Sequence, residues 1–222
     1  MEVIHSLIDF ILHIDKHLAQ ITSQYQSWTY LILFVIIFAE TGFVVTPFLP
    51  GDSLLFAAGA LIAGGASGLD INLLCVILII AAFAGNTVNY MLGSYLGARV
   101  FKEENKILKL SYYLQTKAFF DKHGGKAVIF SRFVPIIRTI APFVAGVGRM
   151  PFARYSLYNI IGGVSWIVIF LYGGYLFGNV PFFKKNFSLV AIIIILVSIL
   201  PPIFAIAKNR FAKKDTKVKV EG

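Results

Sequence analysis

Long apolar stretches, separated by short polar segments, are the main pattern along this chain. Residues 71–96, 155–177 and 187–207 each approach or exceed the roughly 20 apolar residues that a helix needs to cross a bilayer. The pattern therefore predicts three membrane-spanning helices. Pro201 and Pro202 are expected to kink or end the last of them.

Two other apolar stretches, residues 28–63 and 127–147, are interrupted by prolines and glycine. A proline costs about 3 kcal/mol inside a helix, so we expect each stretch to break and fold back as a re-entrant helical hairpin. The residues expected to cause the breaks are Pro47, Pro50 and Gly51 in the first stretch and Pro135 and Pro142 in the second.

The two interrupted stretches resemble each other. "FLPGDSLLFAAGAL" (residues 48–61) and "FVPIIRTIAPFVAGV" (residues 133–147) both open on an aromatic residue, an aliphatic residue and a proline. Both carry a charge two or three residues later and close on small residues around a glycine. The following helices also end alike, in "LGSYLG" and "YGGYLFG". Interrupted apolar segments at corresponding places in two halves are typical of transporters with inverted repeats, so we predict repeats at about 28–98 and 127–178.

The two ends of the chain differ from this membrane domain, which we place at residues 28–207. Residues 1–27 have apolar side chains at helical spacing and polar ones on the other side, which predicts an amphipathic helix at the membrane interface and a linker. His13 and His17 are one turn apart there, but with no third ligand evident we interpret them as part of the polar face and predict no metal site. Residues 208–222 form a basic tail.

Composition and charge support a multi-pass membrane protein. Of the 222 residues 58% are hydrophobic and only 14% charged, and the mean hydropathy is +0.79. The net charge of +9 comes from basic clusters beside the apolar stretches, which is typical of cytoplasmic loops and not of a nucleic-acid-binding surface. Residues 99–126 and the tail are therefore predicted to be cytoplasmic, with residues 127–147 re-entrant from that side and residues 28–63 from the opposite side. The one cysteine, Cys75, excludes an intrachain disulfide and lies in an apolar run, where a catalytic thiol is not expected.

Four charges fall within or beside the interrupted stretches: Glu40, Asp52, Arg132 and Arg138. Each would cost roughly 2.5–3.5 kcal/mol at the centre of a membrane helix, so we expect these side chains to pair or to face water. On one straight helix Glu40 and Asp52 would lie about 18 Å apart, whereas a turn between them brings both towards one cavity. Two interpretations stay open, buried salt bridges between the hairpins and a transport site, and the two can coexist. In a transport site, the arginines suit an anionic lipid head group and the acids a coupling proton.

Polar residues also interrupt the helix predicted at residues 71–96. Asn86, Asn89 and Tyr90, in "GNTVNY", have i, i+3, i+4 spacing and share one face. Hydrogen bonding between helices is one interpretation, and a polar wall of the same cavity is the other.

Together, "FAETGFVVTPFLPGDSLLFAAGAL", "GNTVNYMLGSYLG", "HGGKAVIFSRFVPIIRTIAPFVAGVGRM" and "YNIIGGVSWIVIFLYGGYLFG" resemble the bacterial DedA family of inner-membrane proteins. The resemblance implies two re-entrant hairpins facing one another and a domain shared with eukaryotic lipid scramblases. It also implies links to membrane homeostasis and the proton-motive force, and, for some members, to returning undecaprenyl phosphate across the membrane. The family's essential acids match Glu40 and Asp52, and its essential arginines match Arg132 and Arg138. The family often has an acid where this chain has Asn86, which argues against a proton-relay role at that position.

We therefore expect an all-helical, transporter-like protein of the bacterial inner membrane that moves an anionic lipid, a polyprenyl phosphate or a phospholipid, between leaflets. A proton or a sodium ion would be the coupling ion, and a homo-oligomer is compatible with the sequence. No cofactor and no enzymatic activity are expected, because Glu40 and Asp52 do not reproduce the paired aspartates of intramembrane proteases and His123 stands alone in an expected surface loop. The alternative is a membrane-organising or assembly protein that transports nothing.

Overall fold

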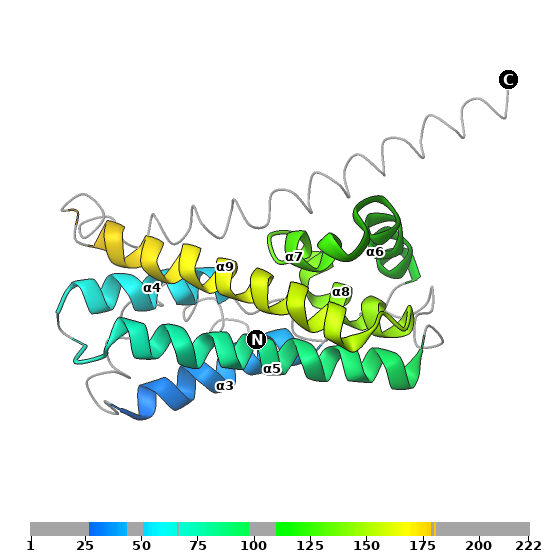
Figure 1. The fold of residues 1–222 in the computed structure, drawn as a ribbon. Coiled ribbons are helices and arrows are strands. Elements are labelled where there is room, and N and C mark those ends of the chain that lie inside the picture. The colour runs from blue at the N-terminus through cyan, green and yellow to red at the C-terminus, as the bar shows by residue number, and fades with distance from the viewer. Residues whose placement is uncertain (1–26, 44–50, 66, 98–109, 179, 181–222) are drawn as a thin grey trace, which may run out of the picture.

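Two long antiparallel helices form the frame of the protein. The computed structural model describes residues 27–43, 51–65, 67–97, 110–178 and 180, and the regular structure of these residues is helical. Helix α5 (Ile71–Leu96) and helix α9 (Phe152–Gly178) pack against each other along the length of the molecule (Figure 1). Tyr172 of α9 donates a hydrogen bond of 2.7 Å to Asn72 near the start of α5, and Tyr155 donates one of 2.8 Å to the Asn86 carbonyl further along. The two helices therefore run in opposite directions.

Shorter helices cover the two ends of this frame. Helices α3 (Trp28–Gly42) and α4 (Gly51–Ala63) lie at one end, and α6 (Leu110–His123), α7 (Ala127–Ser131) and α8 (Pro135–Val147) lie at the other (Figure 1). Helices α3 and α8 pack on α5, whereas α4 and α7 pack on α9. A short 3-10 turn, Gly124–Lys126, joins α6 to α7. The centre of the molecule is thus the place where α3 and α7 end and α4 and α8 begin.

The sequence sets several of these helix ends. The Asp70 side chain accepts a hydrogen bond of 2.7 Å from the Leu73 N–H and so caps the start of α5. Gly97 follows the end of α5 with a φ of 67°, a conformation that favours glycine. Pro135 is the first residue of α8, where its missing N–H costs no helical hydrogen bond. The bounds predicted for the first spanning helix match α5, and α9 begins three residues before its predicted start at residue 155.

The prediction that Pro142 breaks the second interrupted stretch is wrong. Pro142 lies inside α8, and the helix continues to Val147. One missing N–H leaves one carbonyl unpaired, which neighbouring helices and polar side chains can compensate in a membrane protein. The break in this stretch lies instead between α7 and α8, at residues 132–134. Pro47 and Pro50, the helix predicted within residues 1–27, the spanning helix predicted at 187–207 and the basic tail lie outside the described residues.

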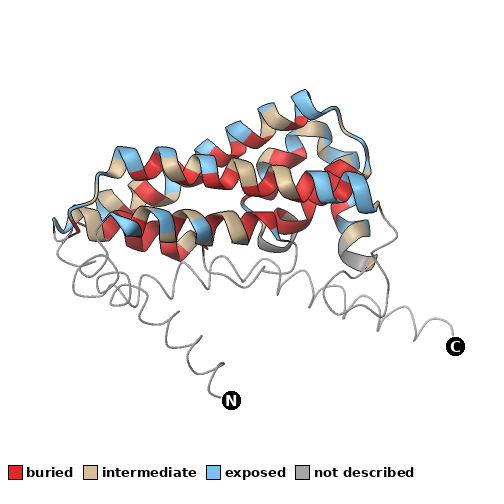
Figure 2. Ribbon diagram, turned by 90° about the horizontal axis from the view of Figure 1, so that it is seen from below, coloured by how far each residue is buried: buried red, intermediate tan, exposed pale blue. Residues whose placement is uncertain are grey.

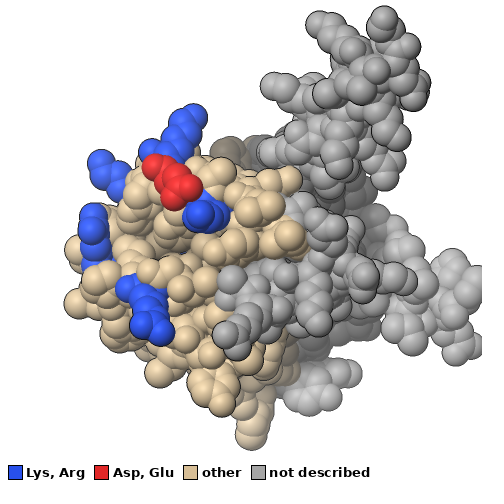
Figure 3. All heavy atoms as spheres, turned by 90° about the vertical axis from the view of Figure 1, so that its right-hand side faces the viewer, with Lys and Arg blue, Asp and Glu red and all other residues tan. Residues whose placement is uncertain are grey.

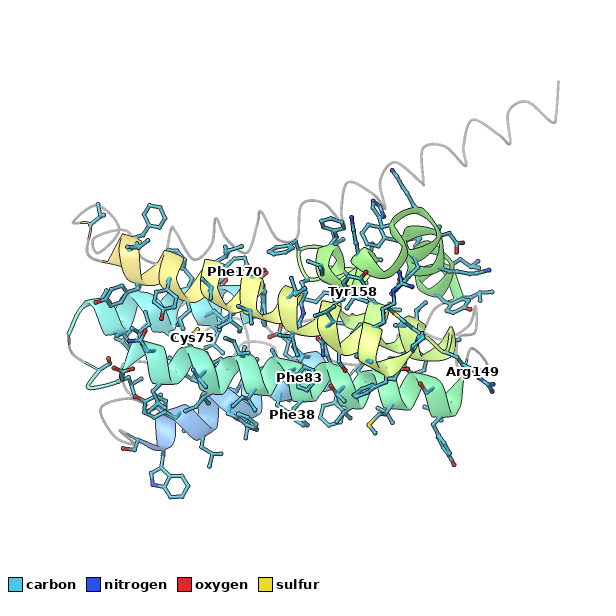
Figure 4. The ribbon with its side chains drawn as sticks, viewed as in Figure 1. Phe38, Cys75, Phe83, Arg149, Tyr158 and Phe170 are labelled. Carbon is cyan, nitrogen blue, oxygen red and sulfur yellow. The ribbon has the colours of Figure 1, made fainter. Side chains whose placement is uncertain are left out.

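The helices bury one side between them and expose the other (Figure 2), and apolar side chains occur on both sides. Ile37 of α3, Leu55 of α4, Leu78 of α5 and Leu171 of α9 meet in one core and are at most 1% exposed. The single cysteine, Cys75, belongs to the same core (Figure 4). The outward faces of α5 and α9 carry exposed valine, leucine and isoleucine side chains. Helices that are apolar on both faces suit a bilayer, and α5 and α9 are each long and apolar enough to cross one.

Glycines allow the short helices to approach the long ones closely, and they do so in the same way at both ends. A Cβ atom on Gly93 of α5 would overlap the backbone of Phe143 in α8. A Cβ atom on Gly174 of α9 would overlap the backbone of Phe56 in α4. The two phenylalanines open the tetrapeptides "FAAG" and "FVAG", whose glycines lie equally close to the partner helix. Small residues at such contacts are typical of helix packing in membranes.

Candidate functional site

The four charged side chains singled out from the sequence are brought together at the centre of the molecule. Glu40 lies in the last turn of α3 and Asp52 is the second residue of α4. Arg132 directly follows α7, and Arg138 is the fourth residue of α8. Glu40, Arg132 and Arg138 are at most 7% exposed and so are buried among protein side chains, whereas the Asp52 side chain is 14% exposed. The cost of burying them makes their partners the main question.

Arg138 holds both acids. Its Nη1 atom lies 2.7 Å from Asp52 Oδ1, and its Nη2 atom lies 2.5 Å from Glu40 Oε1. One guanidinium fork therefore bridges two carboxylates that come from different helices, α3 and α4. Charge-assisted hydrogen bonds of this kind are roughly twice as strong as neutral ones. The pair interactions connect the α3–α4 end of the molecule to α8 at the other end.

Helix dipoles explain part of this pairing. Asp52 lies in the first turn of α4, where the positive end of the helix dipole favours an anion. Glu40 at the end of α3 and Arg138 in the first turn of α8 lie at helix ends that favour the opposite charge. These two disfavoured charges bind each other, so the ion pair offsets the unfavourable dipoles as well as the burial.

Trp166 of α9 completes the surroundings of Asp52. Its indole Nε1–H donates a hydrogen bond of 2.7 Å to Asp52 Oδ1, the same oxygen that Arg138 contacts. The Trp166 ring centroid lies 5.2 Å from Arg138 Cζ and 5.7 Å from Arg132 Cζ. At these distances the ring face can attract both guanidinium cations. Trp166 is fully buried and lies beside three of the four charges.

Arg132 has quite different neighbours. Its Nη2 atom donates to Asn159 Oδ1 of α9 at 2.7 Å and to the Ala82 carbonyl at 3.5 Å. Its Nη1 atom is buried and has no hydrogen-bond partner. Within the described part of the chain, no carboxylate forms an ion pair with it. Arg132 is thus a buried cation with one free donor arm.

Two of the three polar residues predicted on α5 join this centre. Asn89 donates to the carbonyls of Thr41 (3.3 Å) and Thr139 (2.8 Å), and so ties the end of α3 to the start of α8. Asn86 donates to Asn159 at 3.0 Å. With its amide oxygen and nitrogen exchanged, Asn86 would instead accept from Arg132 Nη2 at 2.7 Å. Both asparagines therefore act as hydrogen-bonding links between helices, and Asn86 also lies beside Arg132.

Tyr90, the third of these residues, faces a different part of the molecule. Its hydroxyl donates to the Met150 carbonyl at 2.5 Å, and its ring stacks on Tyr155 at 4.3 Å between centroids. These contacts place it at the junction of α8 and α9 rather than with the four charges. Tyr90 lies on the same face of α5 as Asn86, as predicted, but that part of the face packs against the turn between α8 and α9.

Gly51 is required for a close contact at the site. It was predicted as a hairpin breaker, and it is the first residue of α4. A Cβ atom at this position would overlap the Glu40 carboxylate. The glycine in "PGD" therefore leaves the space in which Glu40 meets Arg138.

The sequence analysis does not identify Asn159 and Trp166, although both contact the charged residues of the site. Tyr155, Asn159 and Trp166 lie on one face of α9 at spacings of four and seven residues, and all three are fully buried. A polar residue on a face that also carries two large aromatics is the signal that could have identified them.

Basic side chains outnumber acidic ones at one end of the described molecule (Figure 3). The exposed lysines and arginines of α6, the turn after it and the residues around the start of α9 are Lys117, Lys122, Lys126, Arg149 and Arg154. Arg149 lies in the turn between α8 and α9 (Figure 4). The same end contains His123, which was expected in a surface loop. It is instead the last residue of α6, with its ring 4.4 Å from the Phe119 ring.

The described residues contain no group of three His, Cys, Asp or Glu side chains that could hold a metal ion. The charged groups of the site are two carboxylates that both bind Arg138, and a second arginine, Arg132, that binds the amide side chain of Asn159. Such an arrangement can exchange internal ion pairs for contacts with an external anion or cation.

The fold and this buried charge cluster define an all-helical integral membrane protein. A family model described as the VTT domain matches residues 49–176, from the start of α4 to near the end of α9. The chain is 49% identical to protein DedA of Escherichia coli (strain K12) over 213 residues, which are 96% of this chain and 97% of that protein. The chain belongs to the DedA family of membrane proteins.

Two further relatives support the membrane location. The chain is 35% identical to inner membrane protein YqjA of Escherichia coli (strain K12) over 179 residues, 80% of each protein. It is 37% identical to an uncharacterized membrane protein of Mycobacterium tuberculosis (strain H37Rv) over 184 residues, 82% of this chain and 81% of the relative. No solved structure matches the chain.

Proposed function

We propose that this protein moves an anionic lipid, with a phosphate in its head group, between the leaflets of the inner membrane. The observation that carries the proposal is Arg132: a buried guanidinium with a free Nη1 atom and no carboxylate partner among the described residues. A planar guanidinium suits a phosphate, and an ionisable residue buried in a membrane protein is a functional candidate by default. The lipid is a polyprenyl phosphate such as undecaprenyl phosphate, or a phospholipid.

In this proposal the two arginines have different tasks. Arg132 binds the phosphate first, because its free arm needs no internal bond to break. Arg138 is held by Glu40 and Asp52 and becomes available only when those pairs open. A proton or a sodium ion on one of the acids would weaken the pairs, which gives the two carboxylates a coupling and gating role. No covalent step is assigned to any residue.

We also propose that α3–α4 and α7–α8 are two re-entrant hairpins of an inverted repeat. The support is the pair of equivalent glycine contacts, in which Gly93 meets Phe143 and Gly174 meets Phe56. In each case the second hairpin helix packs on the long helix of the other half. Transporters of this architecture bind their substrate near the middle of the bilayer, at the interface between the repeats.

The basic end of the molecule sets the proposed orientation. Lys117, Lys122, Lys126, Arg149 and Arg154 would face the cytoplasm, where anionic head groups and the positive-inside rule favour them. The basic C-terminal tail would lie on the same side. Protease protection of a C-terminal tag in sealed spheroplasts, with cleavage after lysis, is the expected result for this orientation.

The test is leaflet exchange of a labelled lipid in proteoliposomes. Wild-type protein should exchange a phosphate-bearing lipid, and Arg132→Gln should slow that exchange by about tenfold or more, the usual effect of losing a hydrogen bond to a charged group. Arg154→Gln is the matched control, because Arg154 is an exposed arginine at the start of α9 that forms no ion pair with the acids of the described residues.

Two results would contradict the proposal. Exchange at the wild-type rate in well-folded Arg132→Gln would remove the phosphate role of Arg132. No exchange by wild-type protein with any phosphate-bearing lipid, together with complementation that tolerates Asp52→Asn, would favour a protein that organises the membrane and transports nothing.

A further inference from the structure

Trp166 lies between Arg132 and Arg138. The proposed function assigns roles to the two arginines and the two acids but none to this tryptophan. It is the largest fully buried side chain described, and it projects from the middle of α9. Its ring contacts both guanidinium groups, at 5.7 Å from Arg132 Cζ and 5.2 Å from Arg138 Cζ. Its N–H donates to Asp52 at 2.7 Å. Through its ring and its N–H, Trp166 contacts three of the four charged residues of the site, Arg132, Arg138 and Asp52.

We propose that Trp166 couples phosphate binding at Arg132 to opening of the Asp52–Arg138 ion pair. The inference rests on the proposed function, since it takes Arg132 as the phosphate site. Trp166 is a positioning residue in this scheme: it touches the two arginines and Asp52, and the phosphate touches Arg132.

The coupling follows from what each contact requires. A cation attracted by a ring face loses part of that attraction when an anion neutralises it. When Arg132 binds phosphate, its attraction for the Trp166 ring therefore weakens. The Arg132 side chain also moves towards the phosphate, which leaves space beside the ring. The indole N–H then shifts relative to Asp52 Oδ1, which is the oxygen that Arg138 shares. The indole N–H helps to hold the Asp52 carboxylate in place against Arg138, so losing this hydrogen bond lets the carboxylate turn away and frees Arg138.

The first experiment measures this coupling as a difference in affinity. Monododecyl phosphate is titrated into protein in phosphatidylcholine nanodiscs, with inorganic phosphate as a second probe that separates a lipid head group from free phosphate. Coupling between two sites is reciprocal, so breaking the Asp52–Arg138 pair with Asp52→Asn should change phosphate affinity. We expect a change of about fivefold or more with Trp166 present, the usual lower range of such coupling. In the Trp166→Phe background the same Asp52→Asn change should alter the affinity less than about twofold. Equal changes in both backgrounds would overturn the coupling.

The second experiment keeps the proposal testable if the Asp52→Asn protein does not fold. The chain has two tryptophans, and Trp28 at the start of α3 is 65% exposed. Trp28→Phe therefore leaves Trp166 as the one tryptophan, whose emission can be excited selectively at the red edge of tyrosine absorption. Saturation with monododecyl phosphate should shift Trp166 emission, and Arg132→Gln should abolish the shift. Binding that saturates without changing the emission would overturn the coupling.

These measurements separate the coupling from the proposed function. If the phosphate probes bind but Trp166 emission does not change, the coupling is wrong, while the proposal that the protein moves lipid still stands. If Trp166 responds through Arg132 but proteoliposomes exchange no lipid, the transport function is wrong and the coupling stands. If neither probe binds, the assignment of phosphate to Arg132 is wrong, and the coupling proposed from it is wrong with it.

Discussion

Arg138 and Arg132 are both buried arginines beside the same tryptophan, yet their partners differ completely. Arg138 donates to two carboxylates, Asp52 and Glu40. Arg132 donates to a side-chain amide and a main-chain carbonyl, and one of its arms has no partner. The sequence makes them look equivalent, because the two flank Pro135 at the same distance, three residues away.

The difference separates a structural charge from an available one. An ion pair buried with good geometry roughly offsets its own desolvation, whereas an unpaired buried charge leaves that cost uncompensated. Arg138 is thus explained by the fold, since it ties α8 to α3 and α4. The free Nη1 atom of Arg132 has no hydrogen-bond partner among the described residues, which is why we propose an external anion as its ligand. Stability and ligand binding should therefore respond oppositely to changes at the two arginines.

The largest effect is expected from Arg138→Gln. It leaves the buried Glu40 and the partly buried Asp52 without their cation, and breaking a buried pair costs about 3–5 kcal/mol. Thermal unfolding in detergent can be followed by maleimide labelling of Cys75, the one cysteine of the chain, which is 7% exposed in the core. The variant should expose Cys75 at a markedly lower temperature than the wild type.

A second set of changes tests whether the cost arises from the carboxylates. Glu40→Gln and Asp52→Asn introduced together into Arg138→Gln should recover a large part of the lost stability, because no charge then remains unpaired among these three residues. Equal melting of the single and triple variants would show that packing of the Arg138 side chain, and not charge, is what the fold needs.

Asn159→Asp should make the surroundings of Arg132 resemble those of Arg138. The new carboxylate would lie at the position of the Asn159 amide oxygen, 2.7 Å from Arg132 Nη2. It should compete with phosphate, and affinity for monododecyl phosphate is expected to fall by about tenfold or more, as for loss of a charged hydrogen bond. Isothermal titration in nanodiscs measures this. Asn72→Asp, at the far end of α5, is the control, and an unchanged affinity in Asn159→Asp would contradict the assignment.

Gly51→Ala should disturb the Arg138 side of the comparison without altering any charge. The added methyl would overlap the Glu40 carboxylate, and overpacking in a buried site costs about 1–3 kcal/mol. Cys75 labelling should again report the lower melting temperature. Gly173→Ala in α9 is the matched control: no atom lies within 4 Å of its added methyl, so the helix should gain up to about 1 kcal/mol from the better propensity of alanine. A harmless Gly51→Ala would mean that Glu40 can leave Arg138 freely.

Much of the fold follows from the sequence by length and periodicity, but the partners within the site do not. The bounds of α5 follow from the sequence because residues 71–96 form one apolar stretch that no proline interrupts, and in the structure Asp70 and Gly97 cap its two ends. Pro142 was misjudged because proline chemistry alone does not reveal how neighbouring helices compensate a lost hydrogen bond. Which arginine pairs with the acids depends on how α3, α4 and α8 pack together. The order of residues along the chain does not give the distances between their side chains. The sequence does not reveal Asn159 and Trp166 for the same reason, because only the packing of α9 against the other helices brings them to the site.

The smallest effect on stability is expected from Arg132→Gln, and it is the most informative about function. Removing this charge takes away a desolvation cost and also the hydrogen bond to Asn159, and the two should nearly cancel, to within about 1 kcal/mol. The Cys75 labelling temperature should therefore stay close to wild type while phosphate binding is lost. If Arg132→Gln melted as early as Arg138→Gln, both arginines would be structural, and the anion site would have to lie elsewhere in the protein.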